Sequence, residues 1–457
     1  MSDYLINPKF NFRWMIFHLS LGFLCTFSKW FLIIWFYLFI ILILNEILSE
    51  LMYSEEIKKL IPALIYLSSF EIMGRMLKAY PYLPWELSKY LIFFTMVFLI
   101  LSGKVKQVNQ IGLIILLLLI PGALIDKSGL VTYSEIINNL LGPVGLALFI
   151  MVIGHYRLTT IELEVVMRLL WNASIPVLVY VFLETPVFSE LSYSLNAGTE
   201  TTGGFGSNQI STILGVGMFL SFYAWMNKLL FTGYHSLDGF FIGFFAFQGF
   251  LSFSRGGMIV GIIAILLYYF LFRTSRAFTS ITKIRSLRPL LFFGLAVTFV
   301  LSSYIIIQNL SSGNLGLRYA GETMGTLIGG KTKTLNTVTT GRYVLLKSDM
   351  DIWNDHFIFG SGAGASKFLR DSDLYGKAPH TEFSRLLAEH GLFGFAILII
   401  TFFLLIKIYR SNKNNINIAI LIVFYFIAVG TSMHSAMRTF VTPIFLALSA
   451  VNIISDN

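Results

Sequence analysis

The chain has 457 residues, of which 56% are hydrophobic and only 12% are charged, whereas soluble domains have about 25% charged residues. Because so little charge cannot cover a soluble particle of this size, the composition predicts an all-α polytopic membrane protein. It excludes soluble enzymes, secreted disulfide scaffolds and disordered proteins. A net charge of +9 is typical of membrane proteins whose cytoplasmic loops are basic. We therefore do not attribute this charge to nucleic acid binding and expect no nucleic acid partner. The single cysteine, Cys25, can form neither an intrachain disulfide nor a cysteine-based metal site.

Membrane helices need about 20 mostly apolar residues, and fourteen segments of the chain meet that description. They lie near residues 14–28, 30–48, 60–77, 86–102, 110–125, 140–154, 165–184, 208–226, 239–252, 256–272, 289–307, 391–406, 416–432 and 439–455. Because some segments are short, we predict 12–14 transmembrane helices. The expected division is a transmembrane bundle of about eleven spans at 1–307, a loop domain at 308–390 and C-terminal transmembrane helices at 391–457.

Basic residues in the short connections predict the orientation, because short cytoplasmic loops are rich in lysine and arginine. With the N-terminus inside, the cytoplasmic connections hold seventeen basic residues and the opposite short connections hold six. We therefore expect both termini in the cytoplasm and segment 308–390 in the periplasm. Within that segment, apolar spacing predicts a helix over 341–359 that stops at the glycine-rich turn 360–364. A second helix is predicted from Thr381 to His390, with Thr381 as its N-cap.

Charged residues inside or beside spans are functional candidates, because their burial in a membrane is costly. Glu71 and Arg75 stand four residues apart on one helical face and can pair. Two interpretations of this pair stay open, a structural ion pair that only orients helices and a functional pair. Arg255 lies between two spans, next to glycines that allow close approach of a ligand. Its guanidinium group can form two parallel hydrogen bonds to phosphate oxygens. The alternative for Arg255 is simple snorkelling to the membrane interface.

Segment 308–390 contains three further candidates. Arg342 follows Gly341, and His380 opens the stretch 379–385. A histidine can accept a proton near neutral pH, which suits activation of a hydroxyl group, although a lone histidine in a polar loop is usually exposed and idle. Glu382 is the nearest carboxylate to His380 in the chain and therefore the second candidate base. No spacing of ligand residues is typical of a zinc or calcium site, and we expect no metal.

Several of these segments occur together in an order that resembles the O-antigen ligase and Wzy-type polymerase superfamily. The matching segments lie at 204–209, which includes Asn208, and at 252–257, 341–342, 359–364, 380–383 and 387–394. They cover about residues 200–400. Before residue 200 the chain matches only in hydropathy, apart from the segment with Glu71 and Arg75.

This resemblance implies a GT-C-like, metal-independent, inverting membrane glycosyltransferase without a cofactor. Such an enzyme takes a glycan from undecaprenyl diphosphate on the periplasmic side of the bacterial inner membrane and joins it to an acceptor hydroxyl. The family pattern implies that Arg255 and Arg342 hold the diphosphate and that His380 is the base. Thr381 stands where many family members have asparagine or serine.

The remaining expectations concern partners and the acceptor. Glu382 is expected beside the base, and Glu71, Arg75 and Asn208 are expected to support the site. The expected partners are the lipid-linked glycan donor, an acceptor glycan lipid and a chain-length regulator. We expect a polymerase of O-antigen, capsule or exopolysaccharide repeat units, because polymerases are the more numerous group. The alternative is an O-antigen ligase that joins the glycan to lipid A core.

A more distant alternative is a lipid-linked oligosaccharide flippase or another transporter. A transporter is expected to show discontinuous helices, or charged residues near the membrane midplane in related halves of the chain. This chain concentrates its charged candidates at one face, which favours catalysis.

Overall fold

The computed structural model describes residues 7–54, 59–188, 190, 191, 193, 195, 197–274, 288–412 and 418–454. The helices of the first half are α2 (Pro8–Phe27), α3 (Trp30–Tyr53), α4 (Leu60–Ser69), α5 (Glu71–Met76), α6 (Leu87–Leu101), α7 (Gln110–Leu124), α8 (Tyr133–Ile153) and α9 (Thr160–Glu184). The second half contains η1 (Glu200–Thr202), α10 (Ser207–Asn227), α11 (His235–Leu251), α12 (Arg255–Thr274), α14 (Arg288–Leu310), α15 (Asn314–Tyr319), α16 (Met324–Leu327), α17 (Leu335–Val338), α18 (Arg342–Asp355), η2 (Ser366–Phe368), α19 (Glu382–Asn412), α20 (Ile418–Ser435) and α21 (Val441–Ser449). The prediction of an all-α polytopic membrane protein is confirmed.

Each of the fourteen predicted spans contains a helix. In the part of the chain that the structure describes, eight helices are long and apolar enough to cross a membrane, namely α3, α8, α9, α10, α12, α14, α19 and α20. Helices α6 and α7 are apolar but shorter. The other predicted spans correspond to α2, to α4 with α5, to α11 and to α21. Nearly all residues of α4 and α21 are buried, so protein rather than lipid surrounds these short helices.

Two short strands supplement the helices. β1 (Arg157–Thr159) and β2 (Asn452–Ile454) pair in parallel, with Arg157 opposite Asn452. The hydropathy pattern predicts no strand here, because two three-residue strands so far apart in the chain leave no periodic signal. Their pairing ties the start of α9 to the last described residues of the chain.

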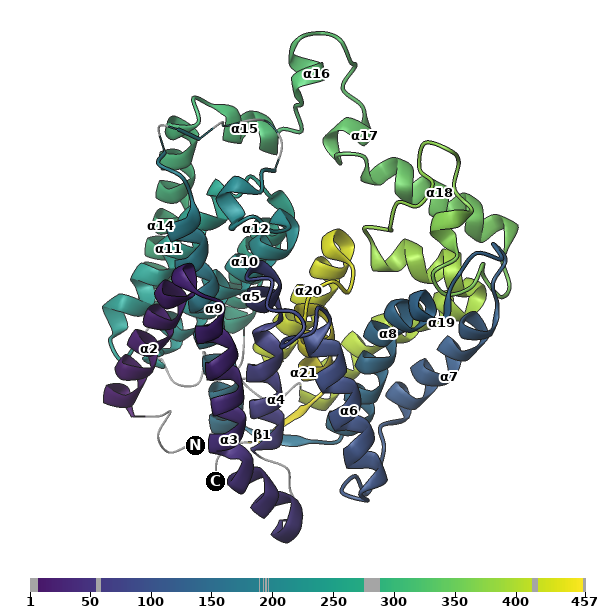
Figure 1. Cartoon of the computed structure of the whole chain (residues 1–457). Coiled ribbons are helices and arrows are strands. Elements are labelled where there is room, and N and C mark those ends of the chain that lie inside the picture. Colours follow the sequence, from purple (N-terminus) through teal and green to yellow (C-terminus); the bar gives the residue numbers. More distant parts are fainter. Residues whose placement is uncertain are drawn as a thin grey trace.

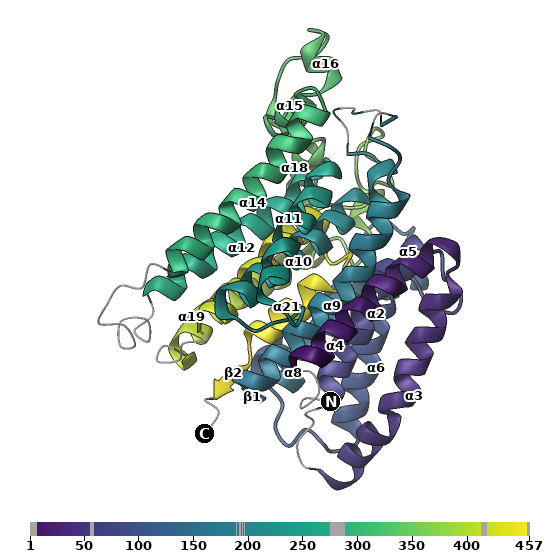
Figure 2. The ribbon, with the colours of Figure 1, turned by 90° about the vertical axis from the view of Figure 1, so that its left-hand side faces the viewer.

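The outer segment, which follows α14 and ends where α19 begins, lies at one end of the helix bundle (Figure 1). The two ends of the chain lie at the opposite end, and Figure 2 shows the same separation after a quarter turn. α18 lies within the stretch 341–359, where a helix was predicted. α19 begins directly after Thr381, whose Oγ1 accepts a hydrogen bond from the Ser384 amide at 3.4 Å. This helix breaks at Gly391, which has φ +58°.

The glycine-rich turn 360–364 fixes the first part of α19 against α7. The amides of Ser361 and Gly362 donate to the carbonyls of Ala388 and Glu389 at 2.9 and 3.0 Å. Gly362 has φ +104°, and a Cβ atom there would lie 1.9 Å from a backbone oxygen at the end of α7. Only glycine fits this contact. The turn therefore determines where the charged residues at the start of α19 lie.

Glycines also bring the first turn of α12 into contact with α10. A Cβ atom on Gly257 would lie 2.2 Å from the carbonyl carbon of Ser211. The backbones of the two helices therefore touch next to Arg255, the first residue of α12.

The orientation can be tested with cysteines at Ser312 and Ser372, which are both exposed in the outer segment. The parent for this test is a Cys25→Ser variant, in which no other thiol is left. We expect both cysteines to react with a membrane-impermeant thiol reagent in cells permeable only at the outer membrane. Labelling that requires lysis of the inner membrane would reverse the topology.

Candidate active site

Three arginines from three different elements gather at the outer end of the bundle. Arg255 begins α12, Arg318 lies in α15 and Arg342 begins α18. Electrostatic interactions link all three guanidinium groups. Among the described residues, no carboxylate lies within ion-pair distance of any of them. The structure therefore brings the two arginines predicted from the sequence together and adds a third, Arg318.

The positive charges in this arginine cluster (Arg255, Arg318 and Arg342) repel one another. Burial, followed by the charges of Arg255 and Arg342, lowers the pKa of Arg318 from its ordinary value of 12.5 to about 10. Burial also lowers the pKa of Arg342, and Arg255 and Arg438 add to that effect. A bound anion would relieve this repulsion, so the cluster is suited to phosphate groups.

A hydrogen-bonded turn sets the position of Arg255. The preceding Ser254 hydroxyl donates to Asn208 Oδ1 at 3.0 Å and accepts from the Ser211 hydroxyl at 2.9 Å. The Arg255 guanidinium itself donates to the Val338 carbonyl at 2.6 Å, which ties it to α17. Asn208 is thus a positioning residue, because its side chain holds the turn that carries Arg255.

His380 lies in a loop that is held from two sides. The Arg438 guanidinium donates to the carbonyl of Pro379 at 2.9 Å. On the other side, Arg370 pairs with Asp349 of α18 at 2.5 Å and also donates to the carbonyl of Lys377. His380 is half-buried, and its Nδ1 atom has no hydrogen-bond partner among the described residues. Nδ1 is therefore a buried hydrogen-bonding atom that the described chain leaves unsatisfied.

The surroundings of His380 keep its imidazole neutral. Burial, and then the positive charges of Arg438, Arg342 and Arg370, lower the pKa of His380 to about 4. At neutral pH the ring is unprotonated, as a general base must be before it takes up a proton.

Glu382 is committed to an ion pair. Its carboxylate is buried and is bound on both oxygens by Arg385, with Nε donating to Oε2 at 3.2 Å and Nη2 bonding to Oε1. Arg385 also contacts Glu389 at 3.4 Å. Uptake of a proton by Glu382 would break this bidentate pair, so the geometry favours a structural role over that of a base.

Glu71 and Arg75 form a buried ion pair that reaches the His380 loop indirectly. Arg75 bonds to Glu71, lies 3.2 Å from Glu86, and donates to the backbone carbonyl of Arg438 at 3.0 Å. Arg438 in turn holds Pro379, the residue before His380. The pair therefore supports the backbone that positions the histidine.

Sequence reasoning missed Arg318 and Arg438 as site residues. Both follow the outer ends of long helices, but other basic residues of the outer connections do so too. Only the fold shows that Arg318 faces the predicted pair of arginines and that Arg438 holds the histidine loop.

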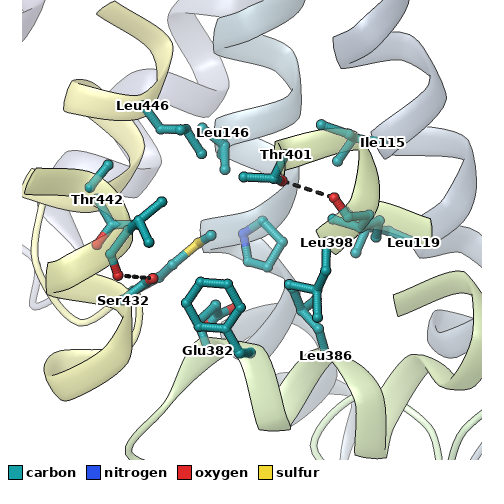
Figure 3. Close-up of a pocket in the computed structure, with 16 residues that line it drawn as sticks. Ile115, Leu119, Leu146, Glu382, Leu386, Leu398, Thr401, Ser432, Thr442 and Leu446 are labelled. Atoms are coloured by element: carbon teal, nitrogen blue, oxygen red, sulfur yellow. Dashed lines mark hydrogen bonds between the residues drawn. The ribbon is translucent and has the colours of Figure 1, made fainter. Parts of the chain in front are cut away.

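Figure 3 shows a small cavity that Glu382 helps to line, where α7, α8, α19, α20 and α21 meet. Its volume is about 40 Å³, and its walls are mainly leucine, isoleucine and other apolar side chains. Such a volume holds at most a few water molecules. The cavity is a packing gap and not a substrate site. Among the described residues, no group of three or more His, Cys, Asp and Glu is placed to hold a metal ion.

The influence of Arg438 on His380 can be measured by an NMR titration of the labelled histidine in detergent. We expect a midpoint near pH 4 in the parent protein, because burial and then the neighbouring cations lower the pKa of His380. Arg438→Gln removes one of these cations and should raise the midpoint toward 6.5. Lys331→Gln, on an exposed turn, is the control and should leave it unchanged. A parent midpoint already at 6.5 would show that the ring is solvated and unaffected by the arginines.

Comparison with known proteins identifies the domain that carries much of this site. Residues 240–399 match the Wzy_C family, described as O-Antigen ligase. This segment includes Arg255, Arg318, Arg342 and His380. No curated protein and no solved structure was found to match the chain. Together with the long apolar helices, this match supports a multi-pass membrane protein of the glycosyl-transferring kind, similar over residues 240–399 to the O-antigen ligase family.

Proposed function

We propose that this enzyme transfers a glycan from undecaprenyl diphosphate to an acceptor hydroxyl at the periplasmic face of the bacterial inner membrane. The arginine cluster carries this proposal, because its guanidinium groups lack carboxylate partners among the described residues. Guanidinium groups bind phosphate oxygens through paired hydrogen bonds. A diphosphate would supply the missing negative charge beside His380.

An apolar cavity next to the arginine cluster supports a lipid-linked donor. It has a volume of about 360 Å³, lies between α12 and α14, and reaches Tyr319, the neighbour of Arg318. Its lining consists of aliphatic and aromatic side chains from α11, α12, α14 and α15. The buried Tyr319 hydroxyl has no hydrogen-bond partner in the described chain and can donate to a phosphate oxygen. A polyprenyl chain in this cavity would bring its diphosphate to Arg318.

The proposed reaction is a single displacement. The acceptor oxygen attacks the anomeric carbon of the donor sugar while His380 takes the hydroxyl proton. The bond between this carbon and the diphosphate oxygen breaks, and the electron pair leaves with undecaprenyl diphosphate. Because the attack is opposite the leaving group, the anomeric configuration inverts. The arginines stabilise the growing negative charge, so the proposed mechanism uses no metal and no cofactor.

We propose that the acceptor is a second lipid-linked repeat unit, which makes the enzyme a polymerase and a chain-length regulator its partner. The alternative is an O-antigen ligase with lipid A core as acceptor, and the family match at residues 240–399 is compatible with both. The two reactions share the donor and the chemistry and differ only in the acceptor.

The function can be tested with lipid-linked repeat units extracted from a strain that lacks this protein. Purified protein in proteoliposomes should join these units into longer chains, which are visible as a ladder on a gel. Lipid A core added as the acceptor tests the ligase alternative in the same assay. Movement of the lipid-linked unit across the bilayer without any glycan transfer would contradict an enzyme and support a flippase.

If the arginine cluster binds diphosphate, lysine should be a poor substitute, because an ammonium group cannot form the paired hydrogen bonds of a guanidinium group. Arg255→Lys, Arg318→Lys and Arg342→Lys should each slow transfer ~100–1,000-fold at normal abundance in the membrane. Arg410→Lys, on an exposed part of α19, is the matched control and should have no effect. Near-normal transfer by all three variants would remove the arginines as the diphosphate site.

For His380, the base role predicts a slower chemical step with donor binding intact. His380→Gln keeps a hydrogen-bond donor but cannot take the proton, so transfer should fall ~100–10,000-fold. Single-turnover rates and binding of undecaprenyl diphosphate separate the two effects. His356→Gln, in the same outer segment, serves as the control. If His380→Gln remains active, histidine is not the base, and Glu382 becomes the next residue to substitute.

A further inference from the structure

A second cavity, whose lining residues are mostly polar or charged, lies against Pro379 in the His380 loop. It has a volume of about 370 Å³ and lies between the outer part of α8, the start of α19, the loop 364–379 and the connection between α20 and α21. This volume falls within the range of about 300–1,000 Å³ that is usual for ligand sites. We call it the α8–α19 pocket. In Figure 1, α8 and α19 lie on the opposite side of α20 from α12 and α15, which carry two of the clustered arginines.

The charges that line the α8–α19 pocket are largely compensated. Lys367 pairs with Glu135 at 2.5 Å, and Arg385 pairs with Glu382 and Glu389. The pocket also presents the side chain of Asn138. Such a lining offers many hydrogen-bond donors and acceptors but little net charge, which suits the hydroxyl groups of a sugar. It contrasts with the arginine cluster, whose charge is uncompensated and suits an anion.

The position of the pocket relative to His380 indicates whether it would bind the donor glycan or the acceptor glycan. Pro379 and Arg438 form part of its wall, and Pro379 directly precedes His380. None of the three clustered arginines lines the pocket. In an inverting displacement the acceptor hydroxyl approaches opposite the leaving diphosphate, and the base must contact that hydroxyl. The acceptor should therefore come from the side of the histidine loop that lies away from the arginines.

We propose that the α8–α19 pocket binds the terminal sugars of the acceptor glycan and delivers their hydroxyl group to His380. This assignment rests on the proposed function and adds a second substrate site to it. The donor and the acceptor then occupy separate cavities, the apolar cavity with the arginine cluster and the polar α8–α19 pocket.

Asn138 offers a direct way to block this pocket. Its side chain is exposed on α8, lines the pocket and donates only a long hydrogen bond of 3.4 Å to Ser134. A tryptophan there would fill the space without breaking an ion pair. Ile137 is the matched control, because it is also exposed on α8 but does not line the pocket.

The first test measures binding without any reaction. The probe is the free oligosaccharide released by mild acid from lipid-linked repeat units of a strain that lacks this protein. Asn138→Trp should weaken oligosaccharide binding ~10-fold or more, because both space and hydrogen bonds are lost, and should bind undecaprenyl diphosphate normally. Arg318→Ala should show the reverse pattern, and Ile137→Trp should bind both as the parent does. Unchanged oligosaccharide binding by Asn138→Trp would overturn the proposal.

The second test separates the acceptor glycan from the donor glycan. Protein preloaded with labelled donor is mixed with increasing amounts of unlabelled acceptor, and the rate of a single transfer is recorded. Asn138→Trp should raise the acceptor concentration for half-maximal rate ~10-fold while donor loading stays normal. Reduced donor loading with an unchanged acceptor dependence would instead place the donor glycan in the pocket and refute the acceptor assignment. No transfer by the parent protein would count against the proposed function, whereas the binding test would still stand.

Discussion

The repulsion among Arg255, Arg318 and Arg342 is the interaction on which the rest of the site depends. Keeping three guanidinium groups together, partly out of water and with no carboxylate partner in the described part of the chain, is unfavourable, so other contacts must hold them in place. The glycine contact between α10 and α12, the bond from Ser254 to Asn208 and the bond from Arg255 to Val338 provide this support. The folded protein therefore keeps an unfavourable concentration of positive charge, which the proposed anionic substrate would relieve. This arrangement also explains why the outer segment must reach back over the bundle, since it brings Arg318 and Arg342 to Arg255.

A second set of contacts connects the two halves of the chain at the histidine. Arg75 holds the carbonyl of Arg438, and Arg438 holds the carbonyl of Pro379. Through these two bonds, a buried ion pair near residue 75 and a connection near residue 438 position the same loop. Such support fixes His380 before substrate arrives, as the proposed proton transfer would require. Burial, and then the charges of Arg438, Arg342 and Arg370, lower the pKa of His380 and keep the imidazole neutral. Arg438 therefore contributes to both the position and the protonation of His380.

Local patterns in the sequence predicted the helix within 341–359, the cap at Thr381 and the turn at 360–364, because apolar spacing, caps and glycines act over a few residues. They also predicted the paired roles of Arg255 and Arg342 through the family resemblance. They could not predict Arg318 or Arg438, since the importance of these residues depends on contacts between distant parts of the chain. Glu382 illustrates the same limit. Its closeness to His380 in the chain suggested a base, but Arg385 binds both of its oxygens in the folded protein.

The most direct measurement is a cryo-electron microscopy structure of the purified protein with undecaprenyl diphosphate. The account predicts density for the diphosphate within hydrogen-bonding distance of Arg255, Arg318 and Arg342, and for the lipid chain in the apolar cavity between α12 and α14. His380 should face the terminal phosphate, which carries the sugar in the full donor. The α8–α19 pocket should be left open. Diphosphate density in the α8–α19 pocket beside Arg385, with the three arginines unoccupied, would contradict the account.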